Sequence, residues 1–156
     1  MNDSLTLKGE VERVIEWDDG RIEKTVFHNT ILRSGRTSLA ASLANNIGNS
    51  FDFFITRMLF GDGGTSGGVP RRVDETRTGL FGSAQVSKPV ISNVDPNNST
   101  QVVFTSVVAF SEGNGVTLNE MSLQMNSGDF YSMATFPGIS KTSQMQITWN
   151  WRLSFI

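Results

Sequence analysis

The sequence has no cysteine and no long apolar run, and these absences limit both its chemistry and its location. Without cysteine it forms neither disulfides nor thiolate metal sites, as expected of an intracellular product or a component of a larger particle. Its apolar runs span only a few residues, whereas a membrane-spanning helix needs roughly 20. The opening residues MNDSLTLKGE have neither a basic start nor an apolar stretch. We therefore expect no membrane partner and no secretory signal.

The sequence also lacks any block of like charge. Its 13 basic and 15 acidic residues are spread along the chain and give a net charge of −2. Proteins that bind nucleic acid through its phosphates normally present a clustered basic surface, so we expect no nucleic-acid partner. A length of 156 residues suffices for a single domain, residues 1–156, with its own hydrophobic core.

The sequence offers little for catalysis, because it has a single histidine, His28. Neither a G-x-S-x-G nucleophile elbow nor an H-E-x-x-H zinc motif occurs. The glycine-rich stretch Gly61–Gly68 lacks the Lys-Ser/Thr of a P-loop and the acidic spacing of an EF-hand. We expect no enzyme activity, no cofactor and no metal site. We interpret His28 as an ordinary surface or hydrogen-bonded residue, and the glycine-rich stretch as a flexible connection or a loop that orders against a neighbouring subunit.

Two acidic positions allow more than one interpretation. Asp18 and Asp19 could contact a cation, but Asp-Asp-Gly is first of all a turn sequence. Glu120 lies between apolar residues of a predicted strand. We expect it at a bulge or on an edge strand, and an ion pair with Arg57 or Arg152 is the alternative.

Alternation of apolar and polar residues is clearest from Gln144 to Ile156. The apolar face carries Met145, Ile147, Trp149, Trp151, Leu153 and Phe155. A period of two is typical of a half-buried strand, and we predict seven or eight strands in all, including a hairpin of residues 118–125 and 130–136. Leucine and alanine spacing predicts one helix at about 35–47, with Ser34 as its N-cap. The predicted fold is mainly β, an antiparallel β-sandwich or jelly-roll-like fold with one α-helix.

The first 28 residues predict a separate element. Residues 4–17 and 21–28 alternate on either side of Asp18-Asp19-Gly20, where glycine supplies the positive φ of a tight turn. Because this hairpin is strongly charged, we interpret it as an N-terminal hairpin arm, or edge hairpin, on a sandwich core of residues 29–156. The residues that we expect to contact partners are Leu5, Leu7, Val11, Ile15, Trp17, Ile22, Val26 and Phe27 of the arm and Asp62, Arg71, Arg72 and Arg77 of the Gly61–Arg77 loop.

From Gly35 onward, the order of motifs resembles that of a known family. The motifs are GRTSLAASLANNI, ITRMLFGDGGTSGG, RTGLFG, LNEMSLQMNSGDFYSMATFP and SKTSQMQITWNWRLSFI. This order is similar to that of small structural proteins of tailed-bacteriophage virions: the N-terminal attachment domain of tail-collar fibres and the stand-alone capsid decoration, or cement, proteins. The matching positions are Glu120, Met121, Leu123, Gly128, Met133, Ala134, Lys141, Thr142 and Trp149.

The resemblance implies a non-enzymatic virion structural protein, assembled in the cytoplasm of a bacterial host. Its partners would be the major capsid protein or other virion proteins, and it would form a homo-oligomer, with a trimer as one candidate. A collar fibre would continue into a long shaft, whereas this sequence stops at the C-terminal strand. A cement protein that bridges major capsid proteins is therefore the first hypothesis. A tail, baseplate or collar adaptor that attaches fibres is the alternative, and a carbohydrate-binding module that uses Trp17 is the third.

Overall fold

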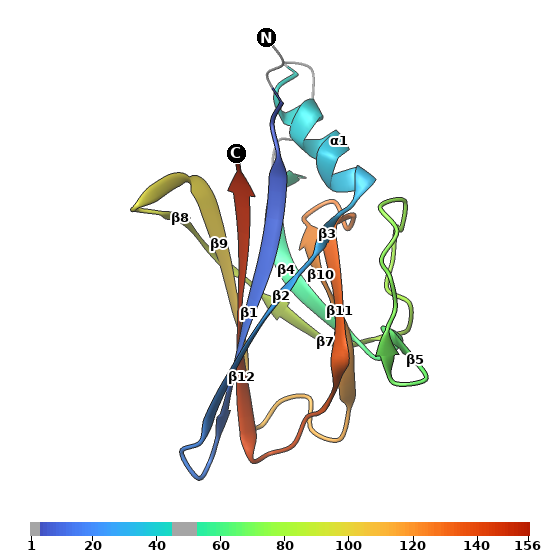
Figure 1. The fold of residues 1–156 in the computed structure, drawn as a ribbon, viewed down its shortest axis with the longest axis vertical. Coiled ribbons are helices and arrows are strands. Elements are labelled where there is room, and N and C mark those ends of the chain that lie inside the picture. The colour runs from blue at the N-terminus through green and yellow to red at the C-terminus, as the bar shows by residue number, and fades with distance from the viewer. Residues whose placement is uncertain (1–3, 45–52) are drawn as a thin grey trace.

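The C-terminal alternation forms the middle strand of one sheet in the computed structural model, which describes residues 4–44 and 53–156. The strands of this first sheet are β1 (Leu7–Trp17), β2 (Ile22–His28), β8 (Ile91–Asp95), β9 (Asn98–Val108) and β12 (Met145–Phe155). Their order is β2-β1-β12-β9-β8, and every pair is antiparallel (Figure 1). The predicted C-terminal strand is thus confirmed, and it has a neighbour on each side.

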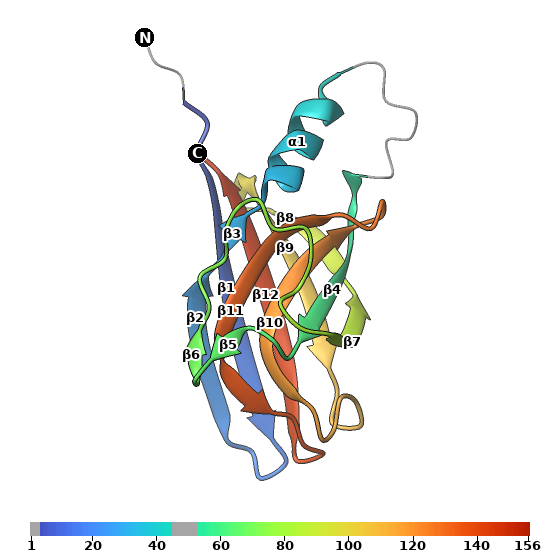
Figure 2. The same cartoon turned by 90° about the vertical axis from the view of Figure 1, so that its right-hand side faces the viewer.

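A second sheet faces the first across the core. Its strands are β3 (Thr30–Ile31), β4 (Ile55–Gly61), β7 (Ala84–Pro89), β10 (Thr117–Met125) and β11 (Phe130–Ser140). The order is β3-β11-β10-β4-β7, again antiparallel, and the predicted hairpin is β10–β11. Figure 2 looks onto this sheet. Within the described residues, the two five-stranded sheets and one helix confirm the predicted antiparallel β-sandwich.

Aromatic side chains fill the space between the sheets. Trp149 and Trp151 of β12 are fully buried, as are Phe60 and Phe136 of the second sheet. The Trp149 ring centroid lies 4.9 Å from that of Phe60 and 5.3 Å from that of Phe136. Burial of one such side chain contributes about 2–3 kcal/mol. The alternation in β12 therefore determines which of its faces is buried, and the second sheet packs against that apolar face.

The expected N-terminal arm does not project from the sandwich. β1 pairs with β12 along its whole length, from Leu7 opposite Phe155 to Trp17 opposite Met145. This register turns Val11 and Ile15 into the core, where they are 0% and 3% exposed. The alternative interpretation, an edge hairpin, holds for β2, which is the edge strand of the first sheet, but not for β1, which is an inner strand. The charged side chains suggested an arm, but all of those on β1 except Arg13 lie on its outer face, and the inner face, Arg13 included, is buried.

The single described helix, α1 (Arg33–Ser42), lies at one end of the sandwich, close to the C-terminus of the chain (Figures 1 and 2). It begins earlier than predicted, and its N-cap is Leu32, without a side-chain hydrogen bond. Ser34 does not cap, because its hydroxyl donates to the Phe130 carbonyl of β11. Gly35 and Ser38 are the helix residues that are buried. The predicted helix positions 45–47 lie outside the described residues.

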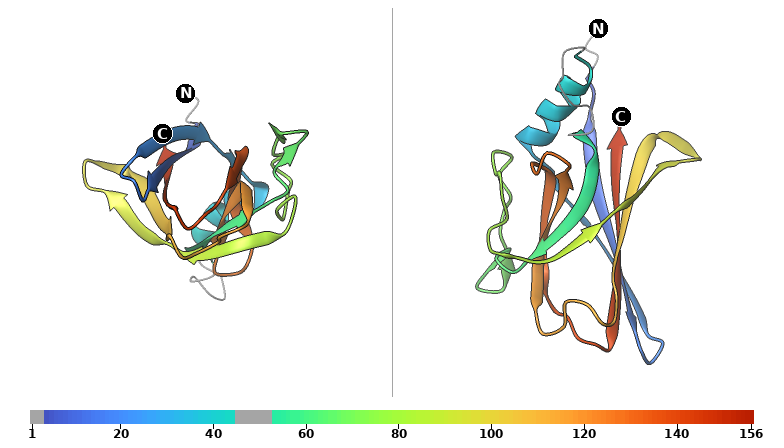
Figure 3. Two further views of the ribbon diagram at one scale, coloured as in Figure 1. Left: turned by 90° about the horizontal axis from the view of Figure 1, so that it is seen from below. Right: turned by 180° about the vertical axis from the view of Figure 1, so that it is seen from behind.

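The glycine-rich stretch is not an irregular connection throughout. Its strand β5 (Thr65–Ser66) pairs with β6 (Val69–Pro70), which follows the stretch directly, and Gly67 and Gly68 form the turn with φ of 58° and 80°. Positive φ at both central positions is the geometry of a tight hairpin turn, which glycine adopts without steric cost. Figure 3 shows this small hairpin outside the second sheet. The prediction of a flexible connection was wrong for this hairpin, because the glycines were interpreted as flexibility and not as turn residues. Ordering of the loop against a neighbouring subunit stays a prediction.

Candidate interaction surfaces

A buried carboxylate holds the glycine–arginine segment, defined as residues 61–83, against the second sheet. Glu120 is 0% exposed. Its carboxylate accepts hydrogen bonds from the backbone N–H groups of Gly63 at 2.9 Å, Phe81 at 2.7 Å and Gly82 at 2.8 Å. Three amide donors satisfy an ionised carboxylate that would otherwise be costly to bury. The segment is therefore fixed at both of its ends by one side chain.

The position of Glu120 answers the question that the sequence left open. The pairing of β10 with β11 shifts register between Leu118 and Glu120, so the predicted bulge is confirmed, although β10 is an inner strand. The alternative ion pairs are wrong: Arg57 bonds to Ser87, and Arg152 lies 3.6 Å from the carboxylate of Glu10. The sequence did signal the site, since an acid between apolar strand residues needs buried partners. It did not reveal that those partners are backbone amides.

Asn119, next to Glu120, completes the attachment of the segment. Its side-chain oxygen accepts from the Gly64 N–H at 2.7 Å, and its amide donates to the Asp62 carbonyl and the Thr65 hydroxyl, both at 3.0 Å. Gly64 lies so close that a Cβ there would be 2.2 Å from the Asn119 carbonyl oxygen. Sequence reasoning missed Asn119, because a lone asparagine gives no signal of its partners.

The attached segment presents arginines at the surface. Arg71 and Arg72 are exposed, whereas Arg77 is half-buried, with its guanidinium 3.6 Å from the Phe81 ring centroid and hydrogen bonds to the Gly79 and Leu80 carbonyls. Asp62 accepts from the Ser83 N–H and from Gln85. Arg71 also contacts the segment, because its Nε donates to the Thr65 carbonyl at 3.3 Å and its guanidinium lies 5.3 Å from the Phe81 ring centroid. Of the four residues predicted here, the structure thus leaves Arg72 most available.

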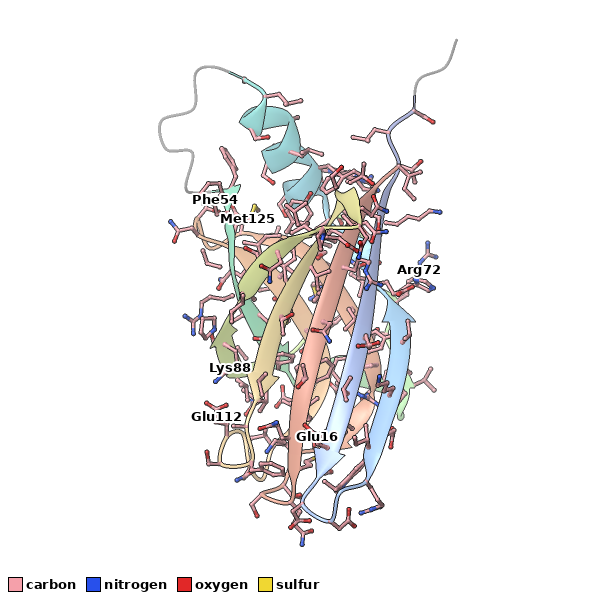
Figure 4. The ribbon with its side chains drawn as sticks, turned by 90° about the vertical axis from the view of Figure 1, so that its left-hand side faces the viewer. Glu16, Phe54, Arg72, Lys88, Glu112 and Met125 are labelled. Carbon is pink, nitrogen blue, oxygen red and sulfur yellow. The ribbon has the colours of Figure 1, made fainter. Side chains whose placement is uncertain are left out.

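The outer face of the first sheet carries a row of carboxylates with cross-strand partners. Three glutamates of β1 face outward opposite β12. The contacts are Glu10 with Arg152 at 3.6 Å, Glu12 with Asn150 at 3.2 Å and Glu16 with Gln146 at 3.4 Å. Figure 4 looks onto this face, with Glu16 on β1 in the foreground and Arg72 at the margin beyond β2. Arg72 therefore lies beyond the β2 edge of the face that carries these carboxylates (Figure 4).

The predicted contact residues of the hairpin divide into three groups. Val11 and Ile15 lie in the core, so contact with a partner is wrong for these two. Leu7, Trp17 and Phe27 are half-buried and pack against the core. Leu5, Ile22 and Val26 are exposed by more than half of their surface. Partner contact stays a prediction for the exposed group.

The helix end of the sandwich has an apolar character. A groove of about 500 Å³ opens between the sheets there, lined among others by Ile55, Val90, Phe104, Tyr131 and Phe155. Burial raises the pKa of the Tyr131 hydroxyl. Large exposed apolar side chains of the molecule include Leu43, Phe54, Ile91 and Ile156.

At the opposite side of the fold, a buried lysine holds a turn. Lys141 is 1% exposed and donates to the side-chain oxygen of Asn114 at 3.0 Å and to the Thr142 carbonyl at 2.9 Å. Burial lowers the pKa of Lys141, and nearby Glu112 partly opposes this shift. Glu112 itself bonds Lys88 at 2.6 Å (Figure 4). Lys141 entered the sequence analysis only through the family motif, and the structure gives it a positioning role in the fold.

The candidate cation site at Asp18 and Asp19 is part of a hydrogen-bonded turn. The Asp19 carboxylate accepts from the Arg21 N–H at 3.0 Å and from its guanidinium at 2.8 Å, and Gly20 has φ of 89°. Hydrogen bonds from Arg21 lower the pKa of Asp19. Within residues 4–44 and 53–156, no cluster of His, Cys, Asp or Glu side chains is arranged to hold a metal ion. In the same part of the chain, no helix has the length and apolar character needed to cross a membrane.

Comparison with known proteins gives one match. A family described as "Phage tail-collar fibre protein, N-terminal" matches residues 24–153, from β2 into β12. No curated protein matches the chain, and no solved structure matches it. The matched range contains the whole second sheet, the whole glycine–arginine segment and the first sheet except β1 and the ends of β2 and β12.

Proposed function

Because this chain belongs to the family of phage tail-collar fibre N-terminal domains, we propose that it is a structural component of the tail or collar, to which it attaches other virion proteins, fibres in particular. The observation that carries the proposal is the extent of the match, 24–153, which includes nine of the twelve described strands in full and most of β2 and β12, and leaves out only β1. The family makes the chain a phage virion structural protein. The place within the virion is our proposal.

The cement hypothesis takes second place for two reasons. The family description names the tail collar and not the head. The projecting arm, which favoured a protein that grips neighbouring capsid subunits, is a pair of strands within the first sheet. The major capsid protein is therefore a less favoured partner than a tail or collar protein.

The geometry fits an attachment role that needs no catalytic step. A two-sheet body with a buried aromatic core is a rigid support, and the segment held by Asn119 and Glu120 adds a fixed surface to it. Binding surfaces on rigid supports lose little conformational entropy when a partner docks. We accordingly propose that the protein acts by contact alone, without enzymatic activity.

Particles assembled without this protein test the proposal. We expect heads that retain their DNA during heating and dilution, on tails that lack fibres or collar structures. Supply of the wild-type chain in trans should restore them. Heads that leak DNA while their tails stay complete would instead support a cement protein, and particles unchanged in both respects would contradict a structural role.

A further inference from the structure

Exposed charges without an ion-pair partner occur on two surfaces of the molecule, and they have opposite sign. Most charges near them are paired: Glu10 with Arg152, Asp19 with Arg21, Glu23 with Arg13 and Arg36 with Glu75. Within the described residues, Glu12 and Glu16 of β1 have no ion pair, and neither do Arg71 and Arg72 of the glycine–arginine segment. These two pairs of residues mark the two surfaces.

The first surface, here named the acidic face, is the outer side of the β1–β2 hairpin. The pairing register puts Glu12 beside Val26 and Glu16 beside Ile22, with Val14 and Lys24 between them. Ile22 and Val26 are 61% and 53% exposed. Among the described contacts, Glu12 and Glu16 meet only neutral amides, so their charges remain available. Lys24 offsets part of this charge, and exposed Asp18 at the turn adds to it.

The second surface, the arginine face, consists of Val69, Pro70, Arg71 and Arg72. Val69 is 67% exposed, and the other three are also exposed. The backbone below is fixed, because the Arg71 N–H donates to the Gly64 carbonyl at 2.8 Å and the Thr135 hydroxyl donates to the Arg71 carbonyl at 2.7 Å. Within the described residues, no ion pair reaches Arg71 or Arg72. This face thus repeats the composition of the acidic face with the opposite charge.

We propose that copies of this chain associate head to tail, with the acidic face of one copy against the arginine face of the next. In each face, exposed aliphatic side chains lie beside charges, and protein interfaces commonly combine an apolar centre with a charged rim. The apolar contact supplies affinity, and charge complementarity supplies register and a faster association rate. Because the two faces differ, the contact is heterologous, and it produces a closed ring or a filament. The inference concerns the purified chain and stands whether or not its place in the virion is the tail.

Charge reversal on each face tests this contact by sedimentation velocity. We expect the wild-type chain to self-associate and to dissociate as salt rises, because about 1 M salt screens charges beyond roughly 3 Å. Glu12→Lys with Glu16→Lys, or Arg71→Glu with Arg72→Glu, should each weaken association at least tenfold. Asp129→Lys, on the β10–β11 turn, is the matched control and should leave association unchanged.

Two rescues make the test specific. A mixture of the two reversed variants should associate, because the reversed face of each variant meets a complementary face on the other. A chain that carries all four substitutions should associate with itself like the wild type. Circular dichroism confirms that each variant is folded. The double variant Val69→Ser with Ile22→Ser removes an exposed apolar side chain from each face, and so tests the same contact without a change of charge. A wild-type monomer at every concentration, association indifferent to both reversals, or failure of both rescues would each overturn the proposal.

Discussion

At the scale of single residues, the positions that carry the family likeness have structural roles in this fold. Glu120 binds three backbone amides, Lys141 fixes a turn, and Trp149 lies in the centre of the aromatic core. None of the three is exposed by more than 1%. Such residues keep a support rigid, whereas the side chains that meet partners lie on the surface and are free to differ.

Glu120→Ala should destabilise the protein by about 3 kcal/mol, because it leaves three amide donors without their acceptor. Glu120→Gln keeps the shape but turns one acceptor into a donor, so we expect about 2 kcal/mol. The measurement is the free energy of unfolding in urea. Glu16→Gln, at an exposed position of β1, serves as the control and should change stability by less than about 0.5 kcal/mol. Equal effects of the Glu120 and Glu16 substitutions would mean that the segment does not depend on the buried carboxylate.

Glu112 should make stability fall in acid. The hydrogen bond from Lys88, followed by that from the Ala109 N–H, lowers the pKa of Glu112. A carboxylate whose pKa is lower in the folded state stabilises the fold above its unfolded pKa of about 4.3 and loses this contribution as pH falls through the folded value. Glu112→Gln should therefore lower the thermal midpoint near neutral pH and leave it closer to that of the wild type in acid. A difference that grows toward low pH would contradict this sign.

Sequence reasoning reached Glu120 but not its partners, for a physical reason. An acidic residue in an apolar strand is visible locally, whereas Gly63 and Phe81 are 57 and 39 residues away along the chain. Only the fold brings them together. For Val11 and Ile15 the alternation correctly predicted a strand. The sequence did not reveal that the second sheet covers their side of this strand, so they were wrongly expected to contact a partner.

At the scale of elements, the β1–β2 hairpin is part of the body of the protein. Deletion of residues 1–28 would expose the whole edge of β12 and remove Val11 and Ile15 from the core. We expect the truncated chain to lose its cooperative unfolding transition and to aggregate, since a long uncovered strand edge pairs with other chains. Calorimetry of the truncated and full chains measures this. A truncated chain with a wild-type melting transition would restore the arm interpretation.

Glycines of the glycine–arginine segment should differ sharply in their tolerance of alanine. Gly64→Ala forces a Cβ against the Asn119 carbonyl, and such overpacking costs about 1–3 kcal/mol. Gly79→Ala is the matched control, because a Cβ there meets nothing within 4 Å and its φ is not positive. We expect it to be neutral or stabilising by about 0.5 kcal/mol. The measurement is the free energy of unfolding of each variant relative to the wild type. Equal changes for the two variants would contradict the close attachment of this segment.

The elements that the sequence predicted are those with a strong local pattern. β12 and the β10–β11 hairpin follow from alternation and from a glycine turn, whose Gly128 has φ of 97°. The β5–β6 hairpin was missed because its strands have two residues each, too few for any period. The pairing of β1 with β12 joins the two ends of the chain, and no local pattern indicates it.

At the scale of the whole molecule, the protein is a two-sheet support with different surfaces on different sides. The acidic face and the arginine face suit contact between copies, and the apolar helix end, with the C-terminus near it, is a third surface. A chain of this kind can serve in an assembly that repeats around an axis, as collars and tails do. The family assignment and the surfaces support the same structural role by separate routes.

Electron cryomicroscopy of the intact virion tests the central claim most directly. We predict that density fitted by the two five-stranded sheets and α1 lies at the collar or tail, in a small number of symmetry-related copies. Density for the same fold spread over the shell of the head in many copies would contradict it.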